Sequence, residues 1–282
     1  MNKSGKILAV LAHPDDESFG MGGTLAMYTR QGVEVHLICA TKGEAGEVDP
    51  EFLQGYDSIA SRRESELLCA SEHLGIARVH FMGYRDSGMP GSKDNQHPKA
   101  LINAPLEKVA EEIVAYIRKF QPDLVLTFDP VGGYHHPDHI HIQKAATLAF
   151  QAAGDPGQYP QTGPAFQPEK LYYHIFPRRF MRVLVQVLRL LGTDPSKFGR
   201  NRDIDLVKLA GDEDYPPHVQ INYQKVKDKK EKASQCHASQ ISFSTQNPLL
   251  RRLTKIFNAG KDTFMQAYPP VAENYRAKDL FG

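Results

Sequence analysis

Two short clusters of histidine and carboxylate side chains stand out in this sequence. The first, at residues 13–17, reads HPDDE and offers one imidazole and three carboxylates within five positions. The second, at residues 134–139, reads YHHPDH. Crowded carboxylates repel one another unless a cation or a proton relieves them, and histidine with aspartate is a common set of metal ligands. Together the clusters predict one metal site built from two turns.

Two imidazoles and one carboxylate around an open fourth position are the ligand set of hydrolytic zinc sites. His13, Asp16 and His139 can supply this set. Ferrous iron or cobalt can occupy the same donors, so the sequence leaves the metal open. Asp15 is then free to act as a general base, because zinc lowers the pKa of a bound water to about 7.

Further roles follow for the rest of the second cluster. We predict that His136 lies beyond the metal and donates a hydrogen bond to the oxyanion of a tetrahedral intermediate. Asp138 is predicted to orient that imidazole and to keep it protonated. Each cluster also has a plainer interpretation, as a solvated acidic turn that caps a helix or as a histidine-rich surface loop. Two such turns at strand ends of one sheet favour the functional interpretation.

Apolar segments immediately before the clusters predict the elements that position them. Residues 7–12 (ILAVLA) are a continuous apolar run, which is typical of a strand buried on both faces, and a further strand is predicted at 124–128 (LVLTF), after Pro122. Further strands are predicted at 33–40 and 79–82, and helices at 24–30, 58–74 and 106–120. This alternation predicts an α/β fold with a Rossmann-like, mostly parallel sheet and helices on both faces. Ligands of such sheets bind outside the carboxyl ends of the strands.

The second half of the chain is less regular. We expect a loop at 154–168, a strand at 170–175, an amphipathic helix at 178–191 with arginines on its outer face, an irregular stretch at 193–217 and a helix at 223–240. The prediction is a single domain over residues 1–282, with a core at 5–153 and a variable region and C-terminal α+β extension at 154–282. Residues 158–217 receive no assigned role.

Composition excludes several classes of protein. The formal net charge is +1, without the basic surplus of a nucleic-acid binder. We find no signal peptide and no apolar run long enough to span a membrane, so a cytoplasmic protein is expected. The three cysteines, Cys39, Cys69 and Cys236, are odd in number and widely spaced. We therefore expect small buried side chains in a reducing compartment and no disulfide.

The two clusters also carry a family resemblance. The HPDDE and HPDH turns resemble those of the LmbE/PIG-L-like family of GlcNAc de-N-acetylases. Residues 63–75 (RESELLCASEHLG) are similar to the arginine-bearing helix of that family, and residues 230–240, ending HASQ, to a C-terminal segment of it. Residues 83–89 (GYRDSGM) and 129–139 look most like the branch that deacetylates N-acetylglucosaminyl-inositol in mycothiol synthesis, and like its relative that cleaves mycothiol S-conjugates.

The resemblance implies a zinc-dependent deacetylase acting on a small amino-sugar substrate. It assigns the metal to His13, Asp16 and His139, the general base to Asp15 and the oxyanion contact to His136. It further implies that Arg63 and Asp86 contact the substrate. Tyr134 is implied to lie near the reacting carbonyl as a further catalytic residue. Enzymes of this kind are often homo-oligomers, which is the expectation here.

Other interpretations remain open at this stage. Arg63 can be a surface ion pair, Asp86 a turn residue before Ser87 and Gly88, and Tyr134 a packed aromatic. An amidase that cuts a larger acyl group or thiol conjugate would use the same residues. A nucleotide-binding module is disfavoured, because no GxGxxG follows the first strand and the acidic turn would repel a pyrophosphate. A metal-binding protein without catalysis is the remaining alternative.

Overall fold

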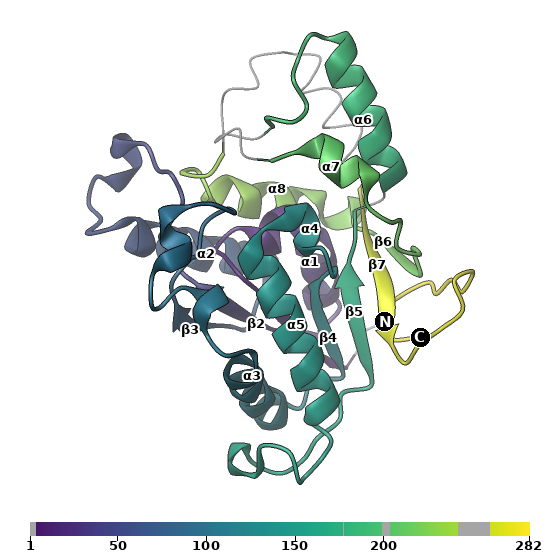
Figure 1. The fold of residues 1–282 in the computed structure, drawn as a ribbon. Coiled ribbons are helices and arrows are strands. Elements are labelled where there is room, and N and C mark those ends of the chain that lie inside the picture. The colour runs from purple at the N-terminus through teal and green to yellow at the C-terminus, as the bar shows by residue number, and fades with distance from the viewer. Residues whose placement is uncertain (1–3, 177, 199–203, 242–259) are drawn as a thin grey trace.

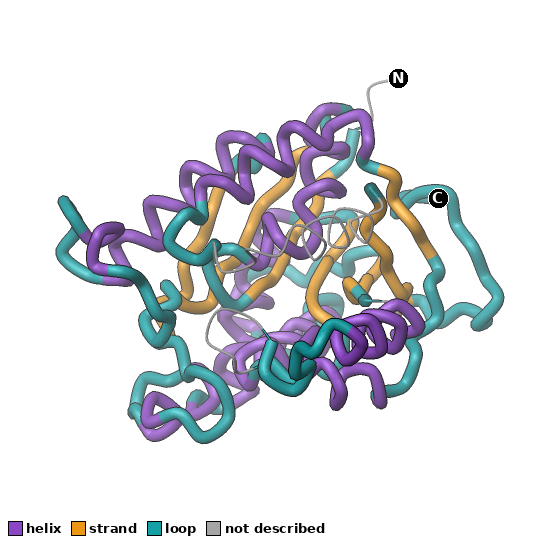
Figure 2. The backbone as a smooth tube through the Cα atoms, turned by 90° about the horizontal axis from the view of Figure 1, so that it is seen from above, coloured by secondary structure: helices purple, strands orange, loops and turns teal. Residues whose placement is uncertain are grey.

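The protein is built around a seven-stranded sheet with helices on both faces (Figures 1 and 2). The structure is a computed structural model and describes residues 4–176, 178–198, 204–241 and 260–282; the side chains of Arg179 and Phe180 are also not described. The strands are β1 (Lys6–Leu11), β2 (Glu34–Thr41), β3 (Arg78–Tyr84), β4 (Leu124–Phe128), β5 (Lys170–His174), β6 (Val219–Asn222) and β7 (Lys261–Tyr268).

The sheet has the strand order β3-β2-β1-β4-β5-β7-β6. The first five strands in this order are parallel, and β7 runs antiparallel to both β5 and β6. The parallel part confirms the α/β prediction. Because β1 lies between β2 and β4, the loops that follow these strands lie side by side at one edge of the sheet.

Helices cover both faces of the sheet. On one face α1 (Gly22–Arg30), α2 (Ile59–Leu74) and α8 (Lys227–Cys236) pack together, and on the other α3 (Leu106–Phe120) packs against α5 (Pro137–Ala152) (Figure 1). The short helices α4 (Gly132–His135) and α7 (Leu206–Gly211) and the longer α6 (Arg178–Leu190) stand beyond the carboxyl ends of the strands. No helix in the described part of the chain is long and apolar enough to cross a bilayer.

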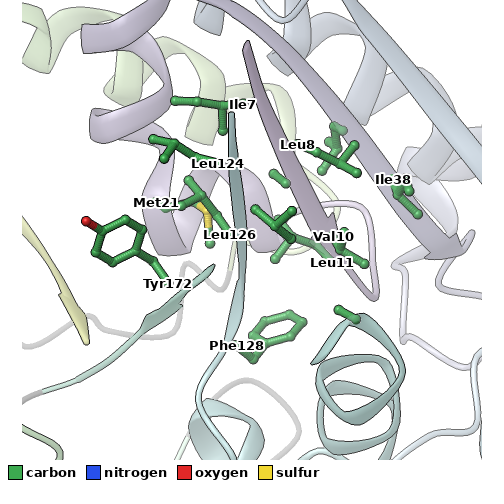
Figure 3. Packing of buried hydrophobic residues seen from close by; sticks show 14 of the residues in the cluster. Ile7, Leu8, Val10, Leu11, Met21, Ile38, Leu124, Leu126, Phe128 and Tyr172 are labelled. Atoms are coloured by element: carbon green, nitrogen blue, oxygen red, sulfur yellow. The ribbon is translucent and has the colours of Figure 1, made fainter. Parts of the chain in front are cut away.

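The core explains why the first and fourth strands are mostly apolar. From Ile7 to Leu11 each side chain is at most 1% exposed, and all five residues of β4 are buried. Figure 3 shows their side chains packed with Met21 and Tyr172 from neighbouring elements. Each fully buried aliphatic side chain stabilises the fold by about 1.5–3 kcal/mol, so a polar residue in either strand would be costly.

Local signals set the bounds of two predicted helices. The side chain of Ser58 accepts the backbone N–H of Ser61 at the start of α2, and Gly75, with φ 76°, ends it in the left-handed conformation. The helix α3 spans the predicted residues 106–120 because its apolar positions recur at helical spacing. Both predictions are confirmed.

The C-terminal third departs from expectation. Strands β6 and β7 were not predicted, and the helix expected at 223–240 is limited to α8, after a 3₁₀ turn at Gln224–Val226. The stretch 193–217 includes the six-residue helix α7. Short strands at the antiparallel end of a sheet are decided by the neighbours they pair with, which local periodicity does not show.

The arginines of α6 do not all face solvent, contrary to the prediction. Arg178 is 1% exposed, and its Nη2 lies 3.3 Å from Asp129 Oδ2, while Nη1 donates to the carbonyl of Gly133 at 3.4 Å. Arg182 does lie outside, paired with Asp214. The side chain of Arg179 lies outside the described residues. A buried cation needs such partners, so Arg178 ties α6 to the loop after β4.

Two of the three cysteines also contradict the sequence-based expectation. Cys39 is buried and free, but Cys69 on α2 and Cys236 at the end of α8 form a disulfide. They lie 167 residues apart in sequence and meet only because α2 packs against α8. His73 lies within 4.8 Å of both sulfurs, but disulfide-bonded sulfurs offer no thiolate to a metal.

We expect this disulfide to stabilise the chain. Replacing Cys69 with serine should lower the free energy of unfolding by roughly 2–4 kcal/mol, because the crosslink restricts the unfolded chain. Urea unfolding under non-reducing conditions measures the change. A reducing agent should lower the unfolding midpoint of the wild type to that of the variant. Equal midpoints for wild type and variant without reductant would contradict the prediction.

Candidate active site

The carboxyl ends of four strands bring the two sequence clusters together. The HPDDE turn follows β1, the loop 129–136 follows β4, and Asp86 follows β3. Thr41, the last residue of β2, donates its backbone N–H to the carbonyl of Ala12. The site is therefore assembled from loops that the parallel part of the sheet holds next to one another, as predicted.

Three predicted metal ligands converge on one point. The closest nitrogens of His13 and His139 (Nδ1 and Nε2) are 3.1 Å apart. Asp16 Oδ1 lies 3.2 Å from His139 Nε2, and Asp16 Oδ2 lies 3.6 Å from His13 Nδ1. Ligands about 2.1 Å from a tetrahedral zinc would be separated by about 3.4 Å, so these spacings suit a zinc ion.

In each of the two imidazole rings, one nitrogen is engaged by a hydrogen-bond partner on the side away from the other ring. His13 Nε2 lies 3.1 Å from Asp138 Oδ2, and His139 Nδ1 lies 3.2 Å from the carbonyl oxygen of Gly132. Because those partners only accept, each ring donates to them and turns its other nitrogen toward the other ring. Two ring nitrogens and a carboxylate that face one another can share a cation, a proton or a metal ion, and the second arrangement is that of a metal site with supporting partners.

The local charge balance points the same way. Burial lowers the pKa of His13, but the carboxylates of Asp86 and Asp138 outweigh it, so the pKa lies well above its ordinary value. Burial raises the pKa of Asp16, but His139 and His13 outweigh it and hold the pKa well below its ordinary value. The buried carboxylates thus stabilise positive charge at this point, whether a proton or a metal carries it.

A second set of donors overlaps the first. Nitrogens of His13, His136 and His139 also lie within 4.8 Å of one another. The distances from Asp16 to the two rings, 3.2 and 3.6 Å, are close to the separation that a bound zinc requires. Asp16 also brings the negative charge that offsets a divalent cation, and so we favour the set that contains Asp16.

Asp15 stands beside this point in an unusual backbone conformation. Its φ is 133°, a region that residues other than glycine seldom adopt and that is found at functional sites. Its Oδ2 accepts a hydrogen bond from Arg63 Nη2 at 3.0 Å. Burial raises the pKa of Asp15 to about 6, against the opposing effect of the Arg63 guanidinium. Arg63 therefore holds the carboxylate in place, and the pKa of Asp15 lies close to neutral pH.

Arg63 is buried and makes several hydrogen bonds within the protein. Its guanidinium also donates to the carbonyls of Pro14 at 2.7 Å and of Gly43 at 3.0 Å. It is 4% exposed, although it does line the cavity described below. A surface ion pair is therefore wrong for Arg63. Its contacts hold the HPDDE turn and the carboxylate of Asp15.

The structure corrects the prediction for Asp138. Its carboxylate does not contact His136; it bonds His13 Nε2 and the backbone and hydroxyl of Ser87. His136 is the N-cap of α5, and its Nδ1 accepts the backbone N–H of Asp138 at 3.2 Å. Burial lowers the pKa of His136 well below its ordinary value, with His13 and His139 adding to the effect. His136 is therefore a neutral ring with its proton on Nε2.

Asp138 thus bonds a predicted metal ligand, His13, which gives a testable consequence. Asp138→Asn should weaken metal binding by about 10- to 100-fold, because His13 loses the carboxylate that fixes its ring and raises its basicity. Competition with a chelator measures the dissociation constant. Asp155→Asn, beyond the far end of α5, is a matched control. The same affinity in both variants would show that Asp138 does not support the ligand.

A polar cavity of about 190 Å³ opens beside these residues. The predicted residues Asp86 and Tyr134 line it together with Asp15, Arg63 and His136. Asp86 Oδ1 lies 3.4 Å from His13 Nε2, and its position is set by the backbone N–H of Gly88. The ring of Tyr134 meets that of His139 edge-on, 4.9 Å between centroids. The predicted residues Asp16, Asp138 and His139 do not line this cavity but lie next to His13, which does.

Sequence reasoning did not assign a role to the segment after α8. His237 Nε2 lies 2.7 Å from Glu17 Oε1, both fully buried, and Ser239 donates its N–H and hydroxyl to Glu66. Gln240 lines the polar cavity. The only signal in the sequence was the resemblance of the HASQ run to a family segment, because its partners are about 170 to 220 residues away.

Known proteins resemble this chain in sequence and in structure. Residues 8–150 match the PIG-L family of GlcNAc-PI de-N-acetylases. A 1D-myo-inositol 2-acetamido-2-deoxy-alpha-D-glucopyranoside deacetylase of Geodermatophilus obscurus is 37% identical over 86% of this chain and 85% of its own length. One of the same name from Rhodococcus erythropolis is 32% identical over 98% and 97%.

The fold also has solved counterparts. The N,N'-diacetylchitobiose deacetylase of Pyrococcus horikoshii superposes with a TM-score of 0.63 at 21% identity, covering 93% of this chain and 83% of that one. The family match spans both halves of the metal site, from β1 to α5, and the two curated relatives extend it over most of the chain. This chain belongs to the PIG-L family of GlcNAc-PI de-N-acetylases.

Proposed function

We propose that the protein is a zinc-dependent N-deacetylase of an N-acetylglucosamine-type substrate. It adds water to the acetamide and releases acetate and a free amino sugar. The observation that carries this is the meeting of two imidazole nitrogens and the Asp16 carboxylate beside a separate carboxylate, Asp15, at the wall of a polar cavity. The names of the sequence relatives support the substrate class.

In this proposal His13, Asp16 and His139 hold the metal. Zinc, when bound there, would polarise the acetamide carbonyl and lower the pKa of water. Ferrous iron or cobalt would fit the same donors. Asp138 and the carbonyl of Gly132 fix the two imidazole rings, so that both ligands are oriented before the metal arrives.

Asp15 serves as the general base in this mechanism. It accepts a proton from the water as the oxygen attacks the carbonyl carbon, and it returns that proton to the nitrogen as the C–N bond breaks. The same group can do both because its pKa, raised to about 6, leaves it ionised at neutral pH and still basic enough to carry the proton between the two steps. Arg63 is a positioning residue, which keeps the Asp15 carboxylate aimed into the cavity.

His136 is proposed to stabilise the oxyanion. Its Nδ1 is taken by the N–H of Asp138, so its Nε2–H is the group left to donate within the cavity. A neutral imidazole can make this bond, and so no charge on His136 is needed. Asp86 and Gln240 on the cavity wall are suited to grip hydroxyls of a sugar or cyclitol, and Tyr134 lies near the place of the carbonyl.

Acetate release from a panel of N-acetylated amino sugars tests the proposal. Protein stripped of metal and reloaded with zinc should release acetate and free amine in equal amounts, and N-acetylglucosaminyl-inositol should be among the best substrates. Metal-free protein is the control. Zinc-loaded protein that hydrolyses no member of the panel would refute the proposed activity.

A further inference from the structure

A second cavity lies on the other side of the proposed metal ligands. Its volume is about 250 Å³, against 190 Å³ for the polar cavity. The two cavities share Asp15, Tyr134 and Ile204. The remaining wall includes four large apolar side chains, Phe19, Met21, Phe128 and Phe176, and the rings of His139 and His174. Asp16 and His139 line only this second cavity, while His13 and His136 line only the polar one. The proposed metal site therefore stands between the two.

The walls of the second cavity suit a hydrocarbon. Phe128 stacks on His139 with ring centroids 3.9 Å apart, and the edge of His174 meets Phe176 at 4.9 Å. Burial lowers the pKa of His174 to about 4, which keeps that wall uncharged. Phe19, at the cavity, is 42% exposed. A bound apolar group would cover it.

The shape of an amide decides what each cavity receives. Its two substituents, on the nitrogen and on the carbonyl carbon, diverge from the reacting carbonyl. The polar cavity, with Arg63, Asp86 and Gln240, suits the hydroxyls on the nitrogen side. The apolar cavity is then left for the acyl side. An acetyl group would place a single methyl there, whereas a cavity of about 150 Å³ already holds a benzene molecule.

We infer that the protein also hydrolyses N-acyl groups longer than acetyl, with unbranched chains of up to about six carbons accommodated between Phe19, Phe128 and Phe176. The inference rests on the proposed amide hydrolysis. Water adds to the carbonyl carbon, the C–N bond breaks, the carboxylic acid leaves from the apolar cavity, and the nitrogen gains a proton to give the same amino sugar. The substrate class is then N-acylated, not only N-acetylated, amino sugars.

A chain-length series tests this in the zinc-loaded enzyme. The probes are N-acetyl, N-butyryl, N-hexanoyl and N-decanoyl glucosamine, with free amine as the readout. Each methylene buried in the cavity is expected to raise kcat/KM by up to about fourfold, so the values should rise to hexanoyl and then fall. An enzyme that hydrolyses the acetyl compound but shows a hexanoyl kcat/KM below one tenth of it would overturn the inference.

Gly20 offers a way to fill the cavity. It lines the cavity, and a Cβ there would lie 3.7 Å from two ring atoms of His174, an ordinary contact. Gly20→Leu should therefore lower the hexanoyl-to-acetyl ratio of kcat/KM at least tenfold, whatever its absolute rate. Gly211→Leu, where a Cβ would meet nothing within 4 Å, is the matched control and should keep the wild-type ratio. An unchanged ratio in Gly20→Leu would contradict the inference.

Binding separates this inference from the proposed function. Hydroxamates of acetic and hexanoic acid resemble the acyl half of the substrate, and calorimetry on zinc-loaded protein gives their affinities. Tighter binding of the hexanoic compound, lost in Gly20→Leu, supports the apolar acyl site even if no amide is hydrolysed. Acetyl hydrolysis without any chain-length effect on rate or binding leaves the proposed function intact and overturns the acyl site.

Discussion

Asp15→Asn is expected to lower kcat by about 10²- to 10⁴-fold while the protein keeps its metal. An amide cannot take the proton of the attacking water, so the reaction loses its base. Asparagine has the same size, can still accept from Arg63, and is among the residues that tolerate a positive φ. The turn and the three proposed ligands should therefore stay in place.

The measurement pairs single-turnover and steady-state rates with metal content for each protein. Asp155→Asn is the control, because Asp155 lies beyond the C-terminal end of α5. The N-terminal end of this 16-residue helix, about 24 Å away, is at the site. A loss of rate that is accompanied by a loss of metal would assign Asp15 to the metal and not to proton transfer. A kcat within threefold of the wild type would refute the role of base.

The second large effect is expected at His139. His139→Ala removes one of two imidazole donors, so zinc affinity should fall by more than the roughly 100-fold that the loss of a supporting residue reaches. Acetate release should be lost with it. The imidazole of His139 also stacks on Phe128, and alanine would leave a hole there. His139→Gln, which keeps more of the volume, should show the same loss of metal.

Two observations make this result interpretable. Circular dichroism and urea unfolding report whether each variant is folded, and zinc titration reports its affinity. His141→Ala, two residues along the same helix and outside both cavities, is the matched control. Folded His139 variants that bind zinc as tightly as the wild type would remove His139 from the ligand set and favour the trio that contains His136.

The sequence by itself was enough for the parallel core and for the composition of the site. The apolar runs of β1 and β4 and the helical spacing of α3 are local patterns, because burial on two faces or on one helical face dictates residue type along a short stretch. The HPDDE and YHHPDH turns follow such strands, so their meeting at one sheet edge could be predicted. The family resemblance of the same turns is confirmed by the comparisons.

Only the tertiary structure decided which side chains of the site contact one another. Asp138 was expected to hold His136 but holds His13, because the Asp138 carboxylate points across the sheet edge while its backbone N–H donates to Nδ1 of His136, the N-cap of α5. The disulfide of Cys69 and Cys236, the ion pair of Arg178 and the contact of His237 with Glu17 join segments far apart in sequence. The second cavity likewise takes its walls from β4, α4 and the segments after β1 and β5. Residue types at close spacing show which chemistry is available, but the direction of each side chain and the partner it meets depend on packing over long sequence distances, which no local pattern records.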